Sequence, residues 1–263
     1  MKTILRCCLA LSLFSLPVAS AADSGAGAYA RLLQRVATDQ GIRWTAFGKD
    51  EKLLLTSFLD WSAATNPVTL GDRNEQLAFW VNAHNACVMK LIADHLPLEN
   101  VMTISGFRDR LKCKIAGGEY SLVELESNIL RPLFNEPRIH FVLWWGTKGG
   151  PRLRSTPYEG KNLENKLEEA TRRALENPLF VRFDAPKTKT KEMAATRAKK
   201  EEKEKLLALS PIFDWYKTDF GPKPAGLLAF VRTHLPPDDA KKVPATLSEA
   251  YFTSFDWTLD SAP

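Results

Sequence analysis

Residues 77–96 carry the sequence LAFWVNAHNACVMKLIADHL, an apolar stretch with two asparagines and a histidine set into its middle. The apolar side chains recur three and four positions apart, and other apolar residues cover most of the remaining helical surface. A helix that is apolar nearly all round belongs in a protein core. Asp72 followed by Glu75 predicts where this helix begins, and Pro97 predicts its end because proline cannot continue a helix. We therefore predict a buried central helix around which the chain packs.

A membrane span is the alternative interpretation of the same stretch. It would place Asn82, His84, Asn85, Lys90 and Asp94 in lipid, where desolvation of polar and charged groups is costly. The sequence therefore favours a core helix, and we predict no membrane span in the mature chain.

The first 21 residues have the three regions of a secretory signal peptide. Lys2 and Arg6 precede an apolar run at residues 7–18, and the small residues Ala19-Ser20-Ala21 follow it. An uncleaved anchor is less consistent with this run, which is shorter than the roughly 20 residues that a span needs. We predict cleavage after Ala21 or Ala22 and a periplasmic or secreted protein.

The charge balance gives no indication of a nucleic-acid partner. The whole chain has 36 Lys and Arg against 31 Asp and Glu, and removal of residues 1–21 leaves 34 basic side chains. A nucleic-acid-binding protein usually concentrates basic residues on one face. We predict no nucleic-acid partner, and the sequence names no other.

The remaining pattern predicts a single α+β domain at residues 22–263, rich in helix, with a small and mostly antiparallel sheet. Predicted helices lie at residues 25–37, 52–63, 77–96, 121–130, 163–175, 206–216 and 227–235. The sheet is predicted to contain a hairpin at residues 111–120, a buried strand at residues 139–145 and a closing strand at residues 251–259.

Two further segments are interpreted as structural. Residues 146–151 lack the spacing of a phosphate-binding loop, so we predict a tight turn. Residues 187–205 contain Lys, Glu, Thr, Arg and Ala and almost no large apolar side chain. They cannot bury much surface, so we predict a solvated, charged insertion rather than a binding arm.

Cys87 and Cys113 are the cysteines of the mature chain. They could pair in an oxidising compartment, but two sparse cysteines are equally typical of buried thiols. Because nothing in the sequence fixes their separation, we predict two separate thiols and keep the disulfide as the alternative.

Several segments, in this order, resemble the markers of the family called domain of unknown function 547. They are LAFWVNAHNA, GGEYSLVELESNILRP, IHFVL followed by PRLR, LSPIFDWYKTDF and SFDWTL. The resemblance runs from about residue 29 to residue 259. It implies a bacterial protein of a type that is often exported, and it assigns no chemistry.

The chain also departs from the family pattern. Relatives typically have a histidine where this chain has Ser127, and a motif such as Asn-Cys-Ala-Ser-x-Ser-Cys-Pro where it has residues 144–151, WWGTKGGP. A thiolate needs an imidazole and an orienting carboxylate nearby. This chain keeps Glu126 and His140 but has an indole in place of the thiol, and an indole is not a nucleophile. If relatives use a thiol, we expect this member to be inactive.

Two classes of function remain. The first is an exported binding or scaffolding module without catalysis, with a binding cleft at Asn82, Asn85, Trp145 and Arg154. We also interpret the two asparagines as fasteners of neighbouring loops, because a buried unpaired amide costs roughly 1–3 kcal/mol.

The second class is a hydrolase or transferase of cysteine-peptidase type, with Cys87 as nucleophile, His140 as base and Glu126 as orienting group, or with Thr147 as nucleophile. A packing role is the alternative for Cys87. We predict neither a cofactor nor a metal site. One observation separates the two classes, namely whether Cys87 or Thr147 meets a His140 ring nitrogen in an open pocket.

Overall fold

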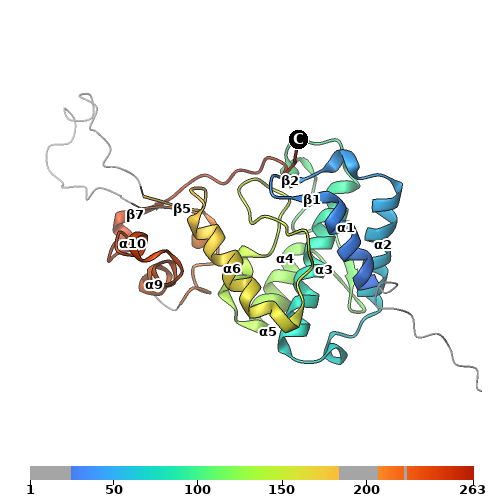
Figure 1. Cartoon of the computed structure of the whole chain (residues 1–263), viewed down its shortest axis with the longest axis horizontal. Coiled ribbons are helices and arrows are strands. Elements are labelled where there is room, and N and C mark those ends of the chain that lie inside the picture. Colours follow the sequence, from blue (N-terminus) through green and yellow to red (C-terminus); the bar gives the residue numbers. More distant parts are fainter. Residues whose placement is uncertain (1–24, 184–206, 222–223) are drawn as a thin grey trace, which may run out of the picture.

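The structure, a computed structural model, describes residues 25–183, 207–221 and 224–263. The predicted signal peptide at residues 1–21 and the predicted charged insertion at residues 187–205 lie outside the described residues. The helices are α1 Gly25–Val36, α2 Lys49–Ala64, α3 Arg73–Ala93, α4 Leu122–Glu124, α5 Arg131–Phe134, α6 Leu163–Glu176, α8 Ile212–Trp215, α9 Pro224–His234 and α10 Pro237–Ala240. Helix dominates, as predicted (Figure 1).

The described strands form three small sheets. They are β1 Ala37–Thr38 with β2 Gly41–Ile42, β3 Cys113–Ile115 with β4 Gly118–Tyr120, and β5 Val181–Phe183 with β6 Leu207–Leu209 and β7 Ala250–Phe252. Only the β6–β7 pair among these is parallel. The helix-rich α+β class is confirmed, but the prediction that one sheet holds all the strands is wrong.

Helix α3 is the predicted central helix. Asp72 is its N-cap and accepts hydrogen bonds from the backbone N–H groups of Asn74 and Glu75, at 2.9 and 3.0 Å. From Leu77 to Ala93 nearly every side chain is buried. Among the described residues, no helix combines the length and the apolar character that crossing a membrane would require.

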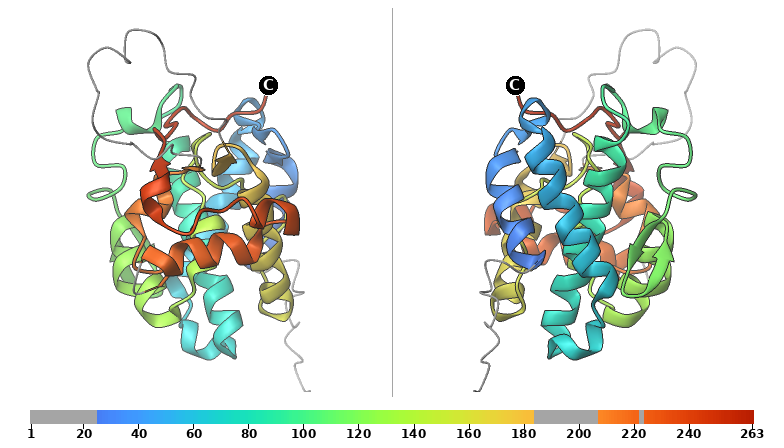
Figure 2. Two further views of the ribbon diagram at one scale, coloured as in Figure 1. Left: turned by 90° about the vertical axis from the view of Figure 1, so that its left-hand side faces the viewer. Right: turned by 90° about the vertical axis from the view of Figure 1, so that its right-hand side faces the viewer.

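The long helices lie beside one another around α3. Helix α1 packs on α2 and α2 packs on α3, which Figure 2 shows in its right-hand view. On the other side of α3 comes α6, followed by α9 and α10 (Figure 1). The buried side chains form two hydrophobic cores, and α6 contributes to both. Leu163 and Leu167 belong to the core around α3, and Ala174 and Leu175 belong to a second core with α8 and α9.

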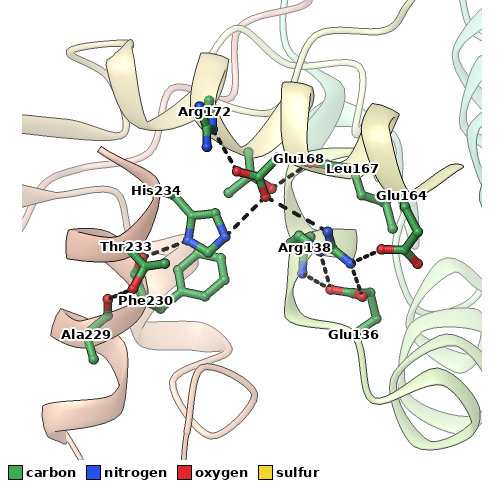
Figure 3. Close-up of polar contacts among 11 residues, drawn as sticks. Glu136, Arg138, Glu164, Leu167, Glu168, Arg172, Ala229, Phe230, Thr233 and His234 are labelled. Atoms are coloured by element: carbon green, nitrogen blue, oxygen red, sulfur yellow. Dashed lines mark hydrogen bonds and ion pairs between the residues drawn. The ribbon is translucent and has the colours of Figure 1, made fainter. Parts of the chain in front are cut away.

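A network of charged side chains joins the elements around α6 (Figure 3). Arg138 pairs with Glu136 and with Glu164 of α6, each at 2.7 Å. Glu168 of α6 lies 3.5 Å from the Nε2 atom of His234, at the end of α9. The second core is thus attached to α6 by polar as well as apolar contacts.

The C-terminal residues return to the first core. Asp260 is fully buried, and its carboxylate accepts a hydrogen bond from Trp144 Nε1 at 3.0 Å. Its backbone carbonyl accepts one from Trp44 Nε1 at 3.1 Å, and its backbone N–H donates to the carbonyl of Gly146 at 2.8 Å. The end of the chain is therefore part of the core around α3.

Residues 139–145 are buried as predicted, but they are not a strand. A 3-10 helix, Pro137–Phe141, begins at Pro137, and an irregular segment follows it. The side chain of Asn85 supplies the hydrogen bonds that a neighbouring strand would have made. It donates to the carbonyl of Val142 at 3.0 Å and accepts from the N–H of Trp144 at 2.9 Å.

Other predicted boundaries also need correction. The predicted helix at residues 206–216 is wrong over its described part, residues 207–216, which contains strand β6 and the short helix α8, because Pro211 interrupts the pattern between them. Of the predicted closing strand, residues 251 and 252 pair in β7, and Thr258 and Leu259 form only isolated bridges, with Asn100 and Thr147. The predicted helix at residues 121–130 does not stop at Pro132 but continues through a π-helical turn, Leu125–Leu130, into α5.

Cys87 and Cys113 form a disulfide, so the prediction of two separate thiols is wrong. The hairpin of β3 and β4 places Cys113 beside α3, with the two Cα atoms 6.0 Å apart. This separation lies within the range that a disulfide requires. Both residues are buried, so the bond attaches the hairpin to the central helix inside the core.

Candidate functional site

Glu126 is the centre of the first polar cluster. Its carboxylate is buried at 3% exposure, on the π-helical turn that follows α4. Ser121 and Glu124 form a capping box that starts this helix and so fixes the position of Glu126. Single π-helical turns occur frequently at functional sites because they redirect side chains. Here the turn directs a carboxylate into the protein interior.

Three groups from distant segments face that carboxylate. The Tyr216 hydroxyl donates a hydrogen bond to Oε2, and an Arg108 guanidinium nitrogen lies 3.7 Å from the same oxygen. His84 Nε2 lies 3.4 Å from Oε1, an ion-pair distance rather than a hydrogen bond. Burial opposes ionisation of Glu126, but His84, Arg108 and Tyr216 outweigh it and lower the pKa of the carboxyl. The cluster therefore holds Glu126 as a carboxylate.

The orientation of His84 is set by the neighbouring amide. Asn85 Oδ1 accepts from the backbone N–H of Trp144 and lies 3.2 Å from His84 Nδ1. An amide oxygen cannot donate, so Nδ1 carries the hydrogen of this contact. His84 Nε2 therefore attracts the Glu126 carboxylate only when it also carries a proton.

A second polar cluster lies on the other side of Tyr216. The His140 ring stacks on the Tyr216 ring at a centroid distance of 3.9 Å, and its Nε2 atom lies 2.8 Å from Asp219 Oδ2. Arg131 donates two hydrogen bonds to the same carboxylate, at 2.6 and 2.7 Å. Burial opposes the ionisation of Asp219, but Arg131 and His140 outweigh it and hold its pKa well below the usual range.

Replacement of Asp219 by asparagine should make the stability of the protein less dependent on acid pH. A carboxyl whose pKa is lowered by folding stabilises the protein fully at pH values above the pKa that it has in the unfolded chain. This contribution decreases as the pH falls below that value, towards the lowered pKa of the folded state. The difference in Tm between the wild type and Asp219→Asn should therefore be largest near neutral pH and shrink in acid. Thermal unfolding followed from about pH 7 to about pH 3 measures it. A difference that stays constant over this range would contradict the assignment.

Trp145 occupies the space beside Arg108 and Tyr216. The Arg108 guanidinium lies over the Trp145 ring at 4.3 Å, and the Tyr216 ring meets it edge-on at 6.2 Å. Trp215 and Trp257 stack beside it at 5.7 and 6.1 Å. An aromatic side chain therefore fills the position that the resemblance assigns to a cysteine.

The predicted catalytic residues are only partly brought together. Glu126 and His140 both contact Tyr216, but Cys87 is bound to Cys113 and has no free thiol. Thr147 is fully buried, and its hydroxyl has no hydrogen-bond partner, so it makes no hydrogen bond with His140. Neither predicted nucleophile is therefore paired with the His140 imidazole.

The four residues of the predicted binding cleft have different surroundings in the structure. Asn82 donates to the carbonyl of Tyr158 at 2.8 Å and accepts from its N–H at 2.9 Å. Asn85 holds residues 142–144, and Arg154 pairs with Glu169 at 3.1 Å. The prediction that the two asparagines fasten loops is confirmed. Trp145 lies in the second core, apart from the loop that Asn82 holds.

A cavity of about 380 Å³ lies between α1, α2, α3 and the loop at residues 157–159. Asn82 is the predicted cleft residue that lines it. Its other lining side chains are Tyr29, Phe58, Trp61, Leu70, Glu75, Ala78, Phe79, Pro157, Tyr158 and Glu159, with Ala26, Gly27 and Ala30 of α1. This volume lies within the range of small-molecule sites, which are typically apolar with a few polar groups.

No sequence motif assigns a chemical role to His84, Arg108, Tyr216 or Asp219. Three of them lie in segments that carry the family resemblance, the exception being Arg108. The ionisable residues of these segments could have been considered as possible neighbours of Glu126 and His140, and this would have indicated the three. No sequence motif marks the lining of the cavity, because its residues come from three helices and a loop.

The comparisons with known proteins identify one family. Residues 68–174 match the family described as "Protein of unknown function, DUF547". No curated protein and no solved structure matches the chain. The matched residues include His84, Glu126 and His140, whereas Tyr216 and Asp219 lie beyond them. The resemblance inferred from the sequence is thereby confirmed over this range, and the chain contains a DUF547 domain, a domain of unknown function, at residues 68–174.

Proposed function

We propose that this protein is a catalytically inactive binding module that takes up a small molecule in the cavity between α1, α2 and α3. The observation that carries the first half of the proposal is the buried disulfide between Cys87 and Cys113. A sulfur in a disulfide is not a thiolate, and the thiolate is the nucleophilic form of cysteine. The alternative of a cysteine-peptidase-like enzyme thereby loses its candidate thiol.

The imidazoles also lack the arrangement that nucleophilic catalysis requires. A general base must lie within hydrogen-bond reach of the group that it deprotonates. His140 Nε2 faces Asp219, its ring is covered by Tyr216, and the residue is 4% exposed. The space that a reacting group would need beside Arg108 and Tyr216 holds Trp145.

The cavity supports the second half of the proposal. It has a volume suited to a ligand, and aromatic and aliphatic side chains form most of its lining. The loop at residues 157–159 closes one side of the cavity, and Asn82 holds this loop by two hydrogen bonds to the backbone of Tyr158. A loop fixed in this way gives the cavity a defined wall before any ligand arrives.

We also propose that the protein is exported to the periplasm or secreted. The charged start, apolar run and small residues of positions 1–21 support this. The disulfide supports it as well, because such bonds persist in oxidising compartments and are rare in the cytosol.

Differential alkylation tests the inactive state. Native protein is treated with iodoacetamide, unfolded without reductant and treated with an isotopically labelled form, and then reduced and labelled a third time. We expect the peptides that contain Cys87 and Cys113 to react only after reduction, because their sulfurs are bonded to each other. Alkylation of Cys87 in the native protein would contradict the proposal and support the enzyme alternative.

A further inference from the structure

The cavity has a continuous aromatic wall. Tyr29 stacks on Phe58 at a centroid distance of 4.4 Å, and Trp61 lies 5.6 Å from Phe58. Phe79 meets Trp61 edge-on at 5.7 Å. These four rings come from α1, α2 and α3, and all four line the cavity. The faces of aromatic rings carry partial negative charge, which attracts cations.

The ionisable groups of the lining are all acidic. They are the carboxyls of Glu75 and Glu159 and the phenols of Tyr29 and Tyr158, and no lysine, arginine or histidine is among the lining residues. Glu75 is half-buried, and one of its oxygens accepts from the backbone N–H of Gly160 at 3.2 Å, which fixes its position. Glu159 pairs with Lys161 at the surface, at 2.9 Å. Charge of one sign in a concave, apolar site favours a ligand of the opposite sign.

Tyr29 contributes its ring but no charge to the lining. The residue is 1% exposed and its hydroxyl oxygen is buried, so a ligand in the cavity does not reach that oxygen. Burial, with a smaller contribution from Tyr158, raises the pKa of this phenol far above its usual value, so the group stays neutral. The acidic character of the lining therefore comes from its two carboxyl groups and not from this phenol.

We propose that the cavity binds an organic cation, a protonated amine carried on an apolar or aromatic body. The aromatic wall contacts the body, and the Glu75 carboxylate balances the charge of the ammonium group. This inference rests on the proposed binding function and specifies its ligand class. A carboxylate or phosphate ligand is disfavoured, because it would face Glu75 and Glu159 without a cation in the lining.

Isothermal titration of the full chain with three probes of similar shape tests the charge preference. The probes are 2-phenylethylamine, 2-phenylethanol and 3-phenylpropanoate, which are cationic, neutral and anionic at pH 7. We expect the amine to bind about tenfold more tightly than the alcohol, as a desolvated cation–π contact with a carboxylate nearby provides, and the propanoate to bind most weakly. Equal binding of amine and alcohol, or the absence of amine binding, would overturn the inference.

Two substitutions locate the effect. Glu75→Gln should remove most of the preference for the amine over the alcohol, while Glu119→Gln, at an exposed position of β4, should leave it unchanged. A preference that survives Glu75→Gln would place the amine elsewhere and contradict the inference.

A further variant separates this inference from the proposed function. Ala30→Leu fills space in the cavity and should abolish the binding of every probe. If all three probes bind equally and Ala30→Leu abolishes their binding, the binding module stands and the ligand class is wrong. Alkylation of native Cys87 would instead overturn the inactive state and leave the ligand class unaffected.

Discussion

Reduction of the Cys87–Cys113 disulfide will lower the free energy of unfolding by about 3.5 kcal/mol, the value expected from loop entropy for a sequence separation of 26 residues. The bond limits the unfolded chain by keeping the hairpin segment close to the α3 segment. Reduction releases this restriction and leaves the native packing of α3 in place. Urea unfolding of the oxidised and the reduced protein, monitored by tryptophan fluorescence, measures the difference.

The variant Cys87→Ala/Cys113→Ala provides a second measurement of the same effect. It should unfold at a lower urea concentration than the oxidised wild type, and reductant should no longer change its midpoint. Equal midpoints for the oxidised and reduced wild type would show that the bond does not form in solution. The proposed inactive state would then lose its main support.

Replacement of Glu126 by alanine will lower the free energy of unfolding by about 3–5 kcal/mol, the usual cost of removing one member of a buried ionic cluster. His84 and Arg108 lose the carboxylate that they face, and the Tyr216 hydroxyl loses its acceptor. Glu126→Gln should cost less, because an amide oxygen can still accept from Tyr216. Urea unfolding at neutral pH measures both variants.

Glu119→Ala is the control for Glu126→Ala. Glu119 is an exposed residue of β4, and its carboxylate pairs with Lys114 at the surface, at 3.9 Å. Its loss should therefore have a much smaller effect than the loss of Glu126. Similar effects for the two variants would mean that the Glu126 cluster does not contribute the stability assigned to it.

The sequence predicts α3 well because its signals are local. Asp72 caps the helix, the apolar side chains repeat with the helical period, and both features depend only on neighbours in the chain. The hairpin was predictable from a local signal too, the glycine pair at residues 117 and 118. In the structure the turn lies one residue earlier, at Ala116 and Gly117, which both have positive φ.

The prediction of a strand at residues 139–145 is wrong because an apolar composition indicates that a segment is buried but does not determine its backbone conformation. A short apolar run looks the same in a buried strand and in a buried irregular segment. Asn85, more than 50 positions earlier, supplies the hydrogen bonds that let the irregular segment stay buried. That contact depends on the tertiary fold, so no local pattern contains it.

The candidate site could be predicted only in part, because its contacts also depend on the tertiary fold. Glu126 and His140 were identified from the resemblance, but Tyr216, which contacts both, comes from a segment more than 70 positions further along the chain. The pairing of Cys87 with Cys113 likewise depends on where the hairpin packs, which the spacing of cysteines does not fix.

The position of Asp260 in the first core has a consequence for the order in which the chain folds. Trp44 and Trp144 obtain their indole hydrogen-bond partner from a residue 216 and 116 positions further along the chain. Until the segment around Asp260 has docked, neither indole N–H is satisfied in the way that the finished core requires. We therefore expect the core around α3 to close late in folding, because contacts between such distant segments form slowly.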